Sequence, residues 1–373
     1  MNKALSIAGI ILLWLMVIAF AVYFNSRAKL HYASTPITST QIILTDSVQD
    51  EVLVKSNTVE RWISRSGIPT TGVPIGEVDL SAIEQTIRKN GFIERVNAYA
   101  TYSGMLRVEV SQRRPMLRLA MDGYNAYLTN DGFIFPTPAG SAVYAPIVTG
   151  TYTPPVPAQY VGSIEEYIAS VIKESEKRIL EMQHEKVPLF ERNKEIRDSL
   201  KEARRLRIER RFLKKLRLNF QPSYQEQYDK EVDRAIALRA QLRKKYRYWQ
   251  RMNNQQIDKI TARQDAEREN QKKLTKRYED LLKLINFVKY IEEDSFWRAE
   301  IVQIVASTMS NGELRIDLIP RSGSHRIKFG TVDDVESKLN RLSTFYRNGL
   351  TNIGWDKFRT ISVEYKGQVV CTK

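Results

Sequence analysis

The stretch "VDLSAIEQTIRKNGFIERVNAYATYSGMLRVEVSQ", residues 78–112, decides the fold of the first globular unit of the chain. Leu80, Ile83 and Ile87 recur at the spacing of a helix, and Asp79 stands before them as an N-cap residue. Two runs of alternating apolar and polar residues follow, one on each side of a Ser-Gly turn. The apolar residues are Val96, Ala98 and Ala100 in the first run, and Leu106, Val108 and Val110 in the second. The stretch therefore predicts a helix followed by a β-hairpin.

The residues before this stretch predict one strand and one more helix. "TQIILTD" has the composition of a strand, and "SNTVERWISRSG" places Val59, Trp62 and Ile63 on one helical face. The predicted order is strand, helix, helix, strand, strand. We assign these elements to a small α/β unit over residues 37–119.

A second, β-rich unit follows in two pieces, residues 120–150 and 281–373. In the first piece, "YNAYLTNDGFIFP" predicts two strands around an Asp-Gly turn, and "YAPIVTG" predicts a third. In the second piece, a helix through "LINFVKYIEED" leads to strands in "EIVQIVAST", "ELRIDLIP" and "HRIKFG". An amphipathic helix over residues 332–349, with Gly349 near its end, comes next.

The last predicted strand is "ISVEYKGQVV", residues 361–370, in which apolar and polar residues alternate. A final strand at the edge of a sheet either receives a partner strand or is an ordinary edge, guarded here by the charges of Glu364 and Lys366. The candidate partner-binding residues are Ile361, Ser362, Val363, Glu364, Tyr365, Lys366, Gly367, Gln368, Val369 and Val370.

Residues 163–280 have a different composition, with no glycine and only Pro188 and Pro222 as prolines. Apolar residues at spacings of three and four predict long helices over residues 164–187, 189–220 and 223–285. The two legs have similar lengths, so we expect an antiparallel helical hairpin with a kink near Pro188 and its tip at residues 219–222.

This predicted hairpin carries most of the charge of the protein. Residues 163–284 contain 32 lysines and arginines and 21 aspartates and glutamates, a net charge of +11 out of +15. Such a segment is either a solvated arm or a surface for an anionic component of the cell envelope. The residues of the second alternative are Arg204, Arg205, Arg211, Lys214, Lys215, Arg243, Lys244 and Lys245. We expect Tyr246 and Trp249, three residues apart, to pack in the seam of the hairpin.

Residues 4–24, "ALSIAGIILLWLMVIAFAVYF", contain no charge and are long enough to cross a bilayer as a helix. A cleaved signal peptide is the alternative, because Ala19 and Ala21 have the spacing of a cleavage site. We expect an uncleaved transmembrane helix, with residues 1–3 before it. Flanking charges do not decide its orientation, since Lys3 on one side faces Arg27 and Lys29 on the other.

The residue types give no sign of catalysis, a cofactor or a metal. Three histidines lie far apart and the single cysteine is Cys371, so no zinc-binding cluster is predicted. No nucleophile with a base and no phosphate-binding glycine loop occurs in a recognisable frame. We expect Trp297, Trp355 and Tyr365 to be core residues, and "RSGSHR" to be a polar turn.

The order of these elements resembles the FtsQ/DivIB family of bacterial cell-division proteins. The stretches that carry the resemblance are "VDLSAIEQTIRKNGFIERVNAYATYSGMLRVEVSQRRP", "NDGFIF", "APIVTG", "FWRAEIVQI", "IPRSGSHRIKFG", "KLNRLSTFYRNGL", "GWDKF" and "YKGQVVCTK". The α/β unit is similar to the family's POTRA domain. The resemblance implies an α+β protein with one N-terminal transmembrane helix, a POTRA-like βααββ domain and a β domain. It does not extend to residues 163–280.

The resemblance also implies a function. Such proteins are non-enzymatic division scaffolds of the inner membrane, with a cytoplasmic N-terminus and a periplasmic bulk at the septum. Their terminal strands bind small bitopic division proteins of the FtsB/FtsL type, and nucleic acid is not expected as a partner. Two alternatives stay open: a POTRA adaptor for transport of outer-membrane proteins, and a tether that binds an envelope polymer through the basic hairpin.

Overall fold

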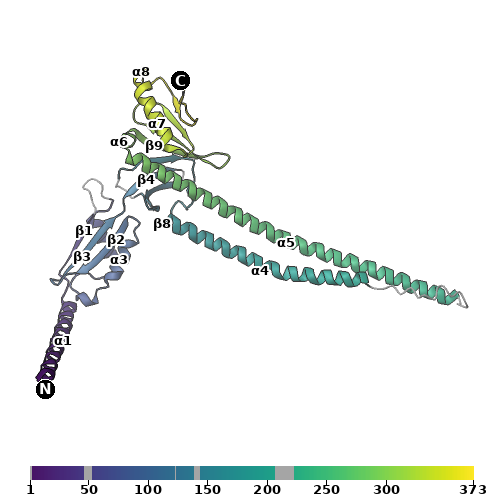
Figure 1. The fold of residues 1–373 in the computed structure, drawn as a ribbon, viewed down its shortest axis with the longest axis horizontal. Coiled ribbons are helices and arrows are strands. Elements are labelled where there is room, and N and C mark those ends of the chain that lie inside the picture. Colours follow the sequence, from purple (N-terminus) through teal and green to yellow (C-terminus); the bar gives the residue numbers. More distant parts are fainter. Residues whose placement is uncertain (1, 46–52, 122, 138–142, 206–221) are drawn as a thin grey trace. The chain divides into compact units, whose positions relative to one another are not determined.

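The computed structural model describes residues 2–45, 53–121, 123–137, 143–205 and 222–373 (Figure 1). The chain forms two compact units. The first comprises Met1–Tyr167 and Tyr278–Lys373, and the second comprises Ile168–Arg277. The mixture of an apolar N-terminal helix, a small α/β domain, a β domain and a long helical hairpin confirms the predicted α+β class.

The N-terminal helix α1 (Asn2–Ser34) is longer than the predicted apolar span. Its part Leu12–Ser34 has a mean hydropathy of 1.2 and contains no buried residue. Among the described helices it alone has the length and composition needed to cross a membrane. At its end, the Tyr32 hydroxyl donates a hydrogen bond of 2.8 Å to the carbonyl oxygen of Ala100. The last turn of α1 thus contacts the first sheet directly.

The first sheet is a three-stranded sheet with two helices. Its elements are β1 (Ser39–Leu44), α2 (Ser56–Arg65), a 3₁₀ turn (Ile75–Glu77), α3 (Leu80–Arg88), β2 (Ile93–Ala100) and β3 (Met105–Gln112). The strand order is β1-β3-β2, with β1 parallel and β2 antiparallel to β3. The Asp79 carboxylate caps α3 by accepting a hydrogen bond of 2.9 Å from the Ala82 N–H. Ile83 and Ile87 of α3 share one buried core with the apolar residues of β3.

The second sheet has ten strands in the order β13-β12-β11-β10-β9-β7-β4-β5-β6-β8. Its strands are β4 (Pro115–Met121), β5 (Tyr124–Thr129), β6 (Phe133–Pro136), β7 (Ile147–Gly150), β8 (Gly162–Ser163), β9 (Ile301–Thr308), β10 (Leu314–Pro320), β11 (Arg326–Gly330), β12 (Thr360–Ser362) and β13 (Val370–Thr372). The boundary predicted at residue 119 falls inside β4, which pairs with β5 and β7 of this sheet.

Strand β7 holds the two halves of the ten-stranded sheet together. On one side it pairs in parallel with β4, where Val148 stands opposite Leu119, and on the other it pairs in parallel with β9, where Val148 stands opposite Ile304. The half from residues 115–163 and the half from residues 301–372 are therefore one continuous sheet. The long helices enter the sequence between these halves.

Four helices belong to the C-terminal half of the second sheet. They are the end of α5 (Pro222–Glu293), α6 (Ser295–Glu300), α7 (Val335–Phe345) with a π-helical segment (Tyr346–Leu350), and α8 (Thr351–Ile353). The Phe287 ring of α5 lies 5.0 Å from the Phe329 ring of β11. The helix predicted to end near Gly349 continues to Ile353, because the positive-φ glycine that ends it is Gly354.

The second unit is an antiparallel pair formed by α4 (Ile164–Arg205) and α5 (Figure 1). Arg178 pairs with Glu267, Arg263 pairs with Glu185, and Arg239 donates to the carbonyl of Arg204. From one contact to the next, the residue numbers increase along α4 and decrease along α5, so the two helices are antiparallel as expected of a hairpin. The predicted tip, residues 219–222, lies outside the described residues except for Pro222, where α5 begins.

Two expectations about the hairpin differ from the structure. The sequence predicted two helices around Pro188, but α4 is one helix through it, since contacts with α5 hold the turns on both sides. Lys186 donates to Gln264 at 2.5 Å, and Asn253 donates to the Leu189 carbonyl at 2.7 Å. In addition, Trp249 does not pack in the seam: its ring contacts Tyr246 but the side chain is 40% exposed.

Candidate partner-binding site

The predicted terminal strand is two short strands joined by a bend. Strand β12 pairs in parallel with β11 and antiparallel with β13, and Ile361 stands opposite Cys371. The prediction of a single strand over residues 361–370 is therefore wrong. The chain reverses between β12 and β13 through Gly367, whose φ of +75° favours glycine.

Contacts with the rest of the domain hold the start of this bend. The Val363 N–H donates to the Lys328 carbonyl at 3.0 Å, and Arg341 donates to the Val363 carbonyl at 3.0 Å. The Glu364 carboxylate pairs with Arg315 of β10 at 2.5 Å. The sequence suggested that Glu364 guards an open edge. Its charge is instead paired within the sheet, with Arg315.

The ten predicted partner-binding residues divide into two groups. Ile361, Ser362 and Val363 are buried, so a partner does not reach their side chains. Tyr365, expected in the core, is 54% exposed, and Val370 is 38% exposed. The accessible part of the predicted site is therefore the bend after Glu364 together with β13. Among the strands that the structure describes, β13 forms one end of the ten-stranded sheet.

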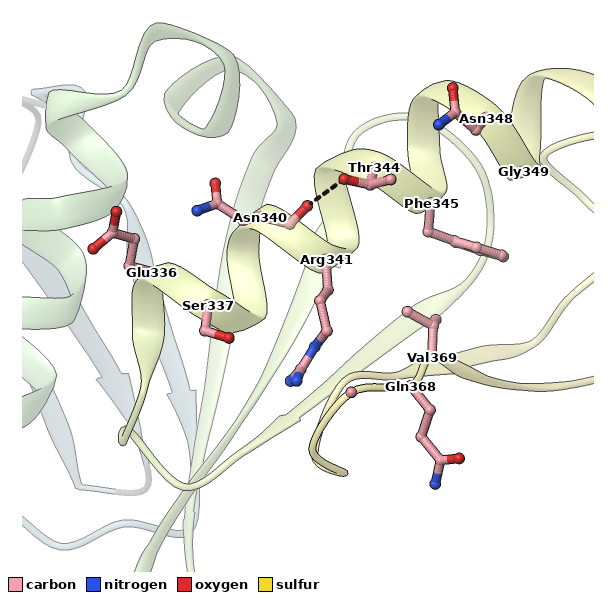
Figure 2. A pocket seen from close by; sticks show the side chains of 11 residues that line it. Glu336, Ser337, Asn340, Arg341, Thr344, Phe345, Asn348, Gly349, Gln368 and Val369 are labelled. Atoms are coloured by element: carbon pink, nitrogen blue, oxygen red, sulfur yellow. Dashed lines mark hydrogen bonds between the residues drawn. The ribbon is translucent and has the colours of Figure 1, made fainter.

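A groove of about 810 Å³ lies beside this end of the sheet. One wall is α7 with its π-helical extension and the other is the bend before β13. Its lining residues are Glu336, Ser337, Asn340, Arg341, Thr344, Phe345, Asn348, Gly349, Gly367, Gln368 and Val369. Figure 2 shows Arg341 and Phe345 pointing from α7 toward the segment that carries Gln368 and Val369. The groove thus combines an aromatic ring with hydrogen-bonding side chains next to an open strand.

A buried histidine–tyrosine pair supports the helix that forms this wall. The His325 Nε2 atom and the Tyr346 hydroxyl lie 2.8 Å apart, and both side chains are buried. Burial lowers the pKa of His325 and raises the pKa of Tyr346, which favours the neutral form of each. The "RSGSHR" segment, expected to be a polar turn, therefore also contributes a core residue.

The buried His325 makes stability depend on pH. Because its pKa is lower in the folded protein, the unfolded chain binds more protons below about pH 6.5. The stability of the fold therefore decreases as the pH is lowered through this range. We expect a lower urea midpoint for the full chain at about pH 5.5 than at about pH 7.5, and a smaller difference in His325→Gln. An unchanged difference in that variant would show that other groups cause the pH dependence.

The predicted anion-facing residues lie on both helices of the hairpin. Arg204 and Arg205 end α4, whereas Arg243, Lys244 and Lys245 lie within α5. Arg211, Lys214 and Lys215 lie outside the described residues. Within the part of the chain that the structure describes, no group of three or more histidine, cysteine, aspartate or glutamate side chains is placed to hold a metal ion.

Comparison with protein families matches two separate stretches of the chain. Residues 37–111 match the POTRA-like domain, which is the three-stranded sheet with α2 and α3. Residues 252–372 match the family described as FtsQ/DivIB, C-terminal related, and this stretch contains the groove and β12 and β13. The FtsQ/DivIB-related match covers 121 of the 373 residues, and together with the POTRA-like match it supports an FtsQ/DivIB-like protein.

The FtsQ/DivIB match has consequences for function and for the hairpin. Both matched families are non-catalytic scaffold domains, and the FtsQ/DivIB family is associated with cell division and with other proteins of the division machinery. Neither of the two matched stretches includes residues 112–251, so α4 and the first part of α5 are outside them. A search of the curated proteins found no match.

Proposed function

We propose that this protein is a non-enzymatic scaffold for septum assembly in the inner membrane. In this proposal α1 spans the membrane with its N-terminus in the cytoplasm, and the POTRA-like and β domains recruit and link divisome proteins in the periplasm. The FtsQ/DivIB-related and POTRA-like matches and an N-terminal helix of suitable length and hydropathy support it. The action is positional, because confinement to one membrane raises the effective concentration of the partners.

The partner that we propose for β13 is a small bitopic division protein of the FtsB/FtsL type. The observation that carries this proposal is the end of the ten-stranded sheet at β13, beside the groove along α7. An added strand would form backbone hydrogen bonds with β13, while a neighbouring helix or loop of the partner would occupy the groove. Phe345 and Val369 would contact apolar side chains of that partner.

In-cell photocrosslinking tests this proposal. Probes at Gln368, Val370 and Thr372 are expected to capture one small bitopic division protein, because these positions line the groove or lie in the edge strand. A probe at Tyr102, which is 81% exposed in the POTRA-like domain, is the control and should not capture it. Equal capture from Tyr102, or no division protein from any of the three positions, would contradict the proposed site.

A further inference from the structure

One stretch of α5 differs in charge from the rest of the hairpin. Residues 234–257 contain seven lysines and arginines and no aspartate or glutamate, over a helical length of about 36 Å. Among the described residues, the ion pairs of the hairpin all lie outside this stretch, as the pairs Arg178–Glu267 and Arg263–Glu185 illustrate. The positive charge of residues 234–257 is therefore neither balanced by acidic residues in the same stretch nor paired in a described ion pair.

The same stretch exposes large apolar side chains on one face of the helix. Leu238, Trp249 and Met252 are 52%, 40% and 43% exposed. At 3.6 residues per turn, these positions and Lys245 fall within an arc of about 60°. The Lys245 Nζ atom lies 4.7 Å from the centroid of the Trp249 ring, so this apolar stripe contains a cation.

The helix surface next to the apolar stripe is basic and exposed. Lys244, Tyr248 and Arg251 occupy it at spacings of four and three. The opposite side of the helix faces α4, because Arg239 and Asn253 each donate a hydrogen bond of 2.7 Å to a backbone carbonyl of α4. Pairing with α4 thus leaves the apolar stripe and the basic surface free at the same time.

We propose that residues 234–257 bind the surface of an anionic lipid bilayer. The helix would lie along the surface, with the apolar stripe among the lipid headgroups and upper acyl chains and the basic residues against anionic headgroups. Each basic residue near such a surface strengthens the attraction to anionic headgroups. A hydrated anionic polymer would satisfy the cations but would leave Leu238 and Met252 in water, and tryptophan and tyrosine are typical of membrane interfaces.

This proposal is independent of the division role and of β13. The helix α1, whose length and hydropathy suit a membrane span, would tether the whole chain to a bilayer. Weak contacts between residues 234–257 and lipid would then suffice, because the tether raises the effective lipid concentration. The surface would hold the hairpin against the membrane, whatever partner the β domain binds.

A fluorescent probe at position 248 tests the proposal in the full chain. Since Cys371 is the only cysteine, Tyr248→Cys combined with Cys371→Ser gives a single labelling site. The labelled protein is placed in vesicles of phosphatidylcholine alone, or with about 30% phosphatidylglycerol, and quenching by spin-labelled lipid is measured. We expect at least about threefold stronger quenching in anionic vesicles, and its loss at about 1 M salt, where the screening length is about 3 Å.

Two matched variants separate this surface from the general charge of the hairpin. Lys244→Glu, Lys245→Glu and Arg251→Glu together should abolish the extra quenching. Equivalent changes at Lys272, Lys273 and Lys276, exposed residues of the same helix, should leave it intact. Circular dichroism checks that both variants keep their helices, and Leu238→Gln with Met252→Gln tests the apolar stripe.

Several outcomes would overturn the proposal. These are equal quenching in both kinds of vesicle, no quenching in either, or equal loss in the two charge-reversal variants. Unchanged quenching after the Leu238 and Met252 substitutions would also overturn it, since the stripe would then not enter the bilayer. A response of the probe to soluble polyglutamate but not to anionic vesicles would identify an anionic polymer or an acidic protein as the partner instead.

Discussion

Replacing Gly150 with alanine is expected to prevent the ten-stranded sheet from forming correctly. A Cβ atom at this position would lie 2.0 Å from the carbonyl oxygen of Ala306, and φ is +117°, a value that side chains rarely adopt. The carbonyl oxygen belongs to the backbone of a paired strand and the Cβ is fixed to another, so no flexible side chain can move to relieve the overlap. We expect a loss of more than about 4 kcal/mol in the free energy of unfolding, or no folded β domain.

The position of Gly150 explains why the effect should be so large. It stands opposite Ala306 in the parallel pairing of β7 and β9, the pairing that joins the two halves of the sheet. A shift of β7 away from β9 to accommodate the Cβ would break that pairing and expose the buried Val148 and Ile304. A domain with a total stability of about 5–15 kcal/mol tolerates such a change poorly.

Gly132→Ala is the matched control for Gly150→Ala. Gly132 also has a positive φ, +75°, but an added Cβ would meet no atom within 4 Å. Only the cost of the left-handed backbone remains, about 1–2 kcal/mol. Urea unfolding of the two variants, followed by tryptophan fluorescence, separates the cost of the positive φ from the cost of the overlap between the Cβ and Ala306. A difference between them smaller than about 1 kcal/mol would contradict the predicted overlap with Ala306.

The POTRA-like unit could be predicted from sequence because its signals are local. Asp79 caps the helix that follows it, and Gly104 occupies the turn between β2 and β3 with a φ of +78°. Each of these residues lies within a few positions of the element that it helps to form. The apolar faces of the helices and strands then pack together as their periods indicate.

The joining of the two β segments depends on contacts that the sequence pattern does not contain. Val148 and Ile304 stand opposite each other although 155 intervening residues separate them. The alternation of apolar and polar residues around each of them predicts a strand, but it does not indicate which strands pair. The boundary at residue 119 was misplaced for the same reason, since only the pairing of β4 with β5 and β7 shows to which sheet it belongs.

The candidate site was located by sequence, but its shape was not. The alternation over residues 361–370 is compatible with one long strand, and the structure replaces it by β12, a bend and β13. The contacts that fix the bend come from Lys328, Arg341 and Arg315, which are distant in sequence. The groove along α7 exists because of this bend, so a sequence pattern could not reveal it.

Replacing Cys371 with proline is expected to weaken binding of the bitopic partner without destabilising the β domain. The Thr372 carbonyl accepts a hydrogen bond from the Arg359 N–H, so the backbone groups of Thr372 face β12. Successive residues of a strand direct these groups to opposite sides. The N–H of Cys371 therefore points away from β12, to the side where a partner strand would pair.

The expected loss of affinity for Cys371→Pro follows from the hydrogen bond that it removes. A proline has no N–H, and an acceptor of the partner strand would be left unpaired at the interface, at a cost of about 1–3 kcal/mol. This corresponds to a complex that is roughly fivefold to 150-fold weaker. The measurement is the affinity of the full chain for the cross-linked partner, in detergent, together with the thermal midpoint of each variant.

Two further variants decide whether backbone pairing is the cause. Cys371→Ser changes the side chain but keeps the N–H, so it should bind the partner as the original chain does. Thr372→Pro removes an N–H that faces β12, and it should lower the thermal midpoint by loosening β13 itself. If Cys371→Ser weakened binding as much as Cys371→Pro, the side chain would make the contact, and strand addition at β13 would be wrong. If neither affected binding, the partner would use the groove along α7 alone.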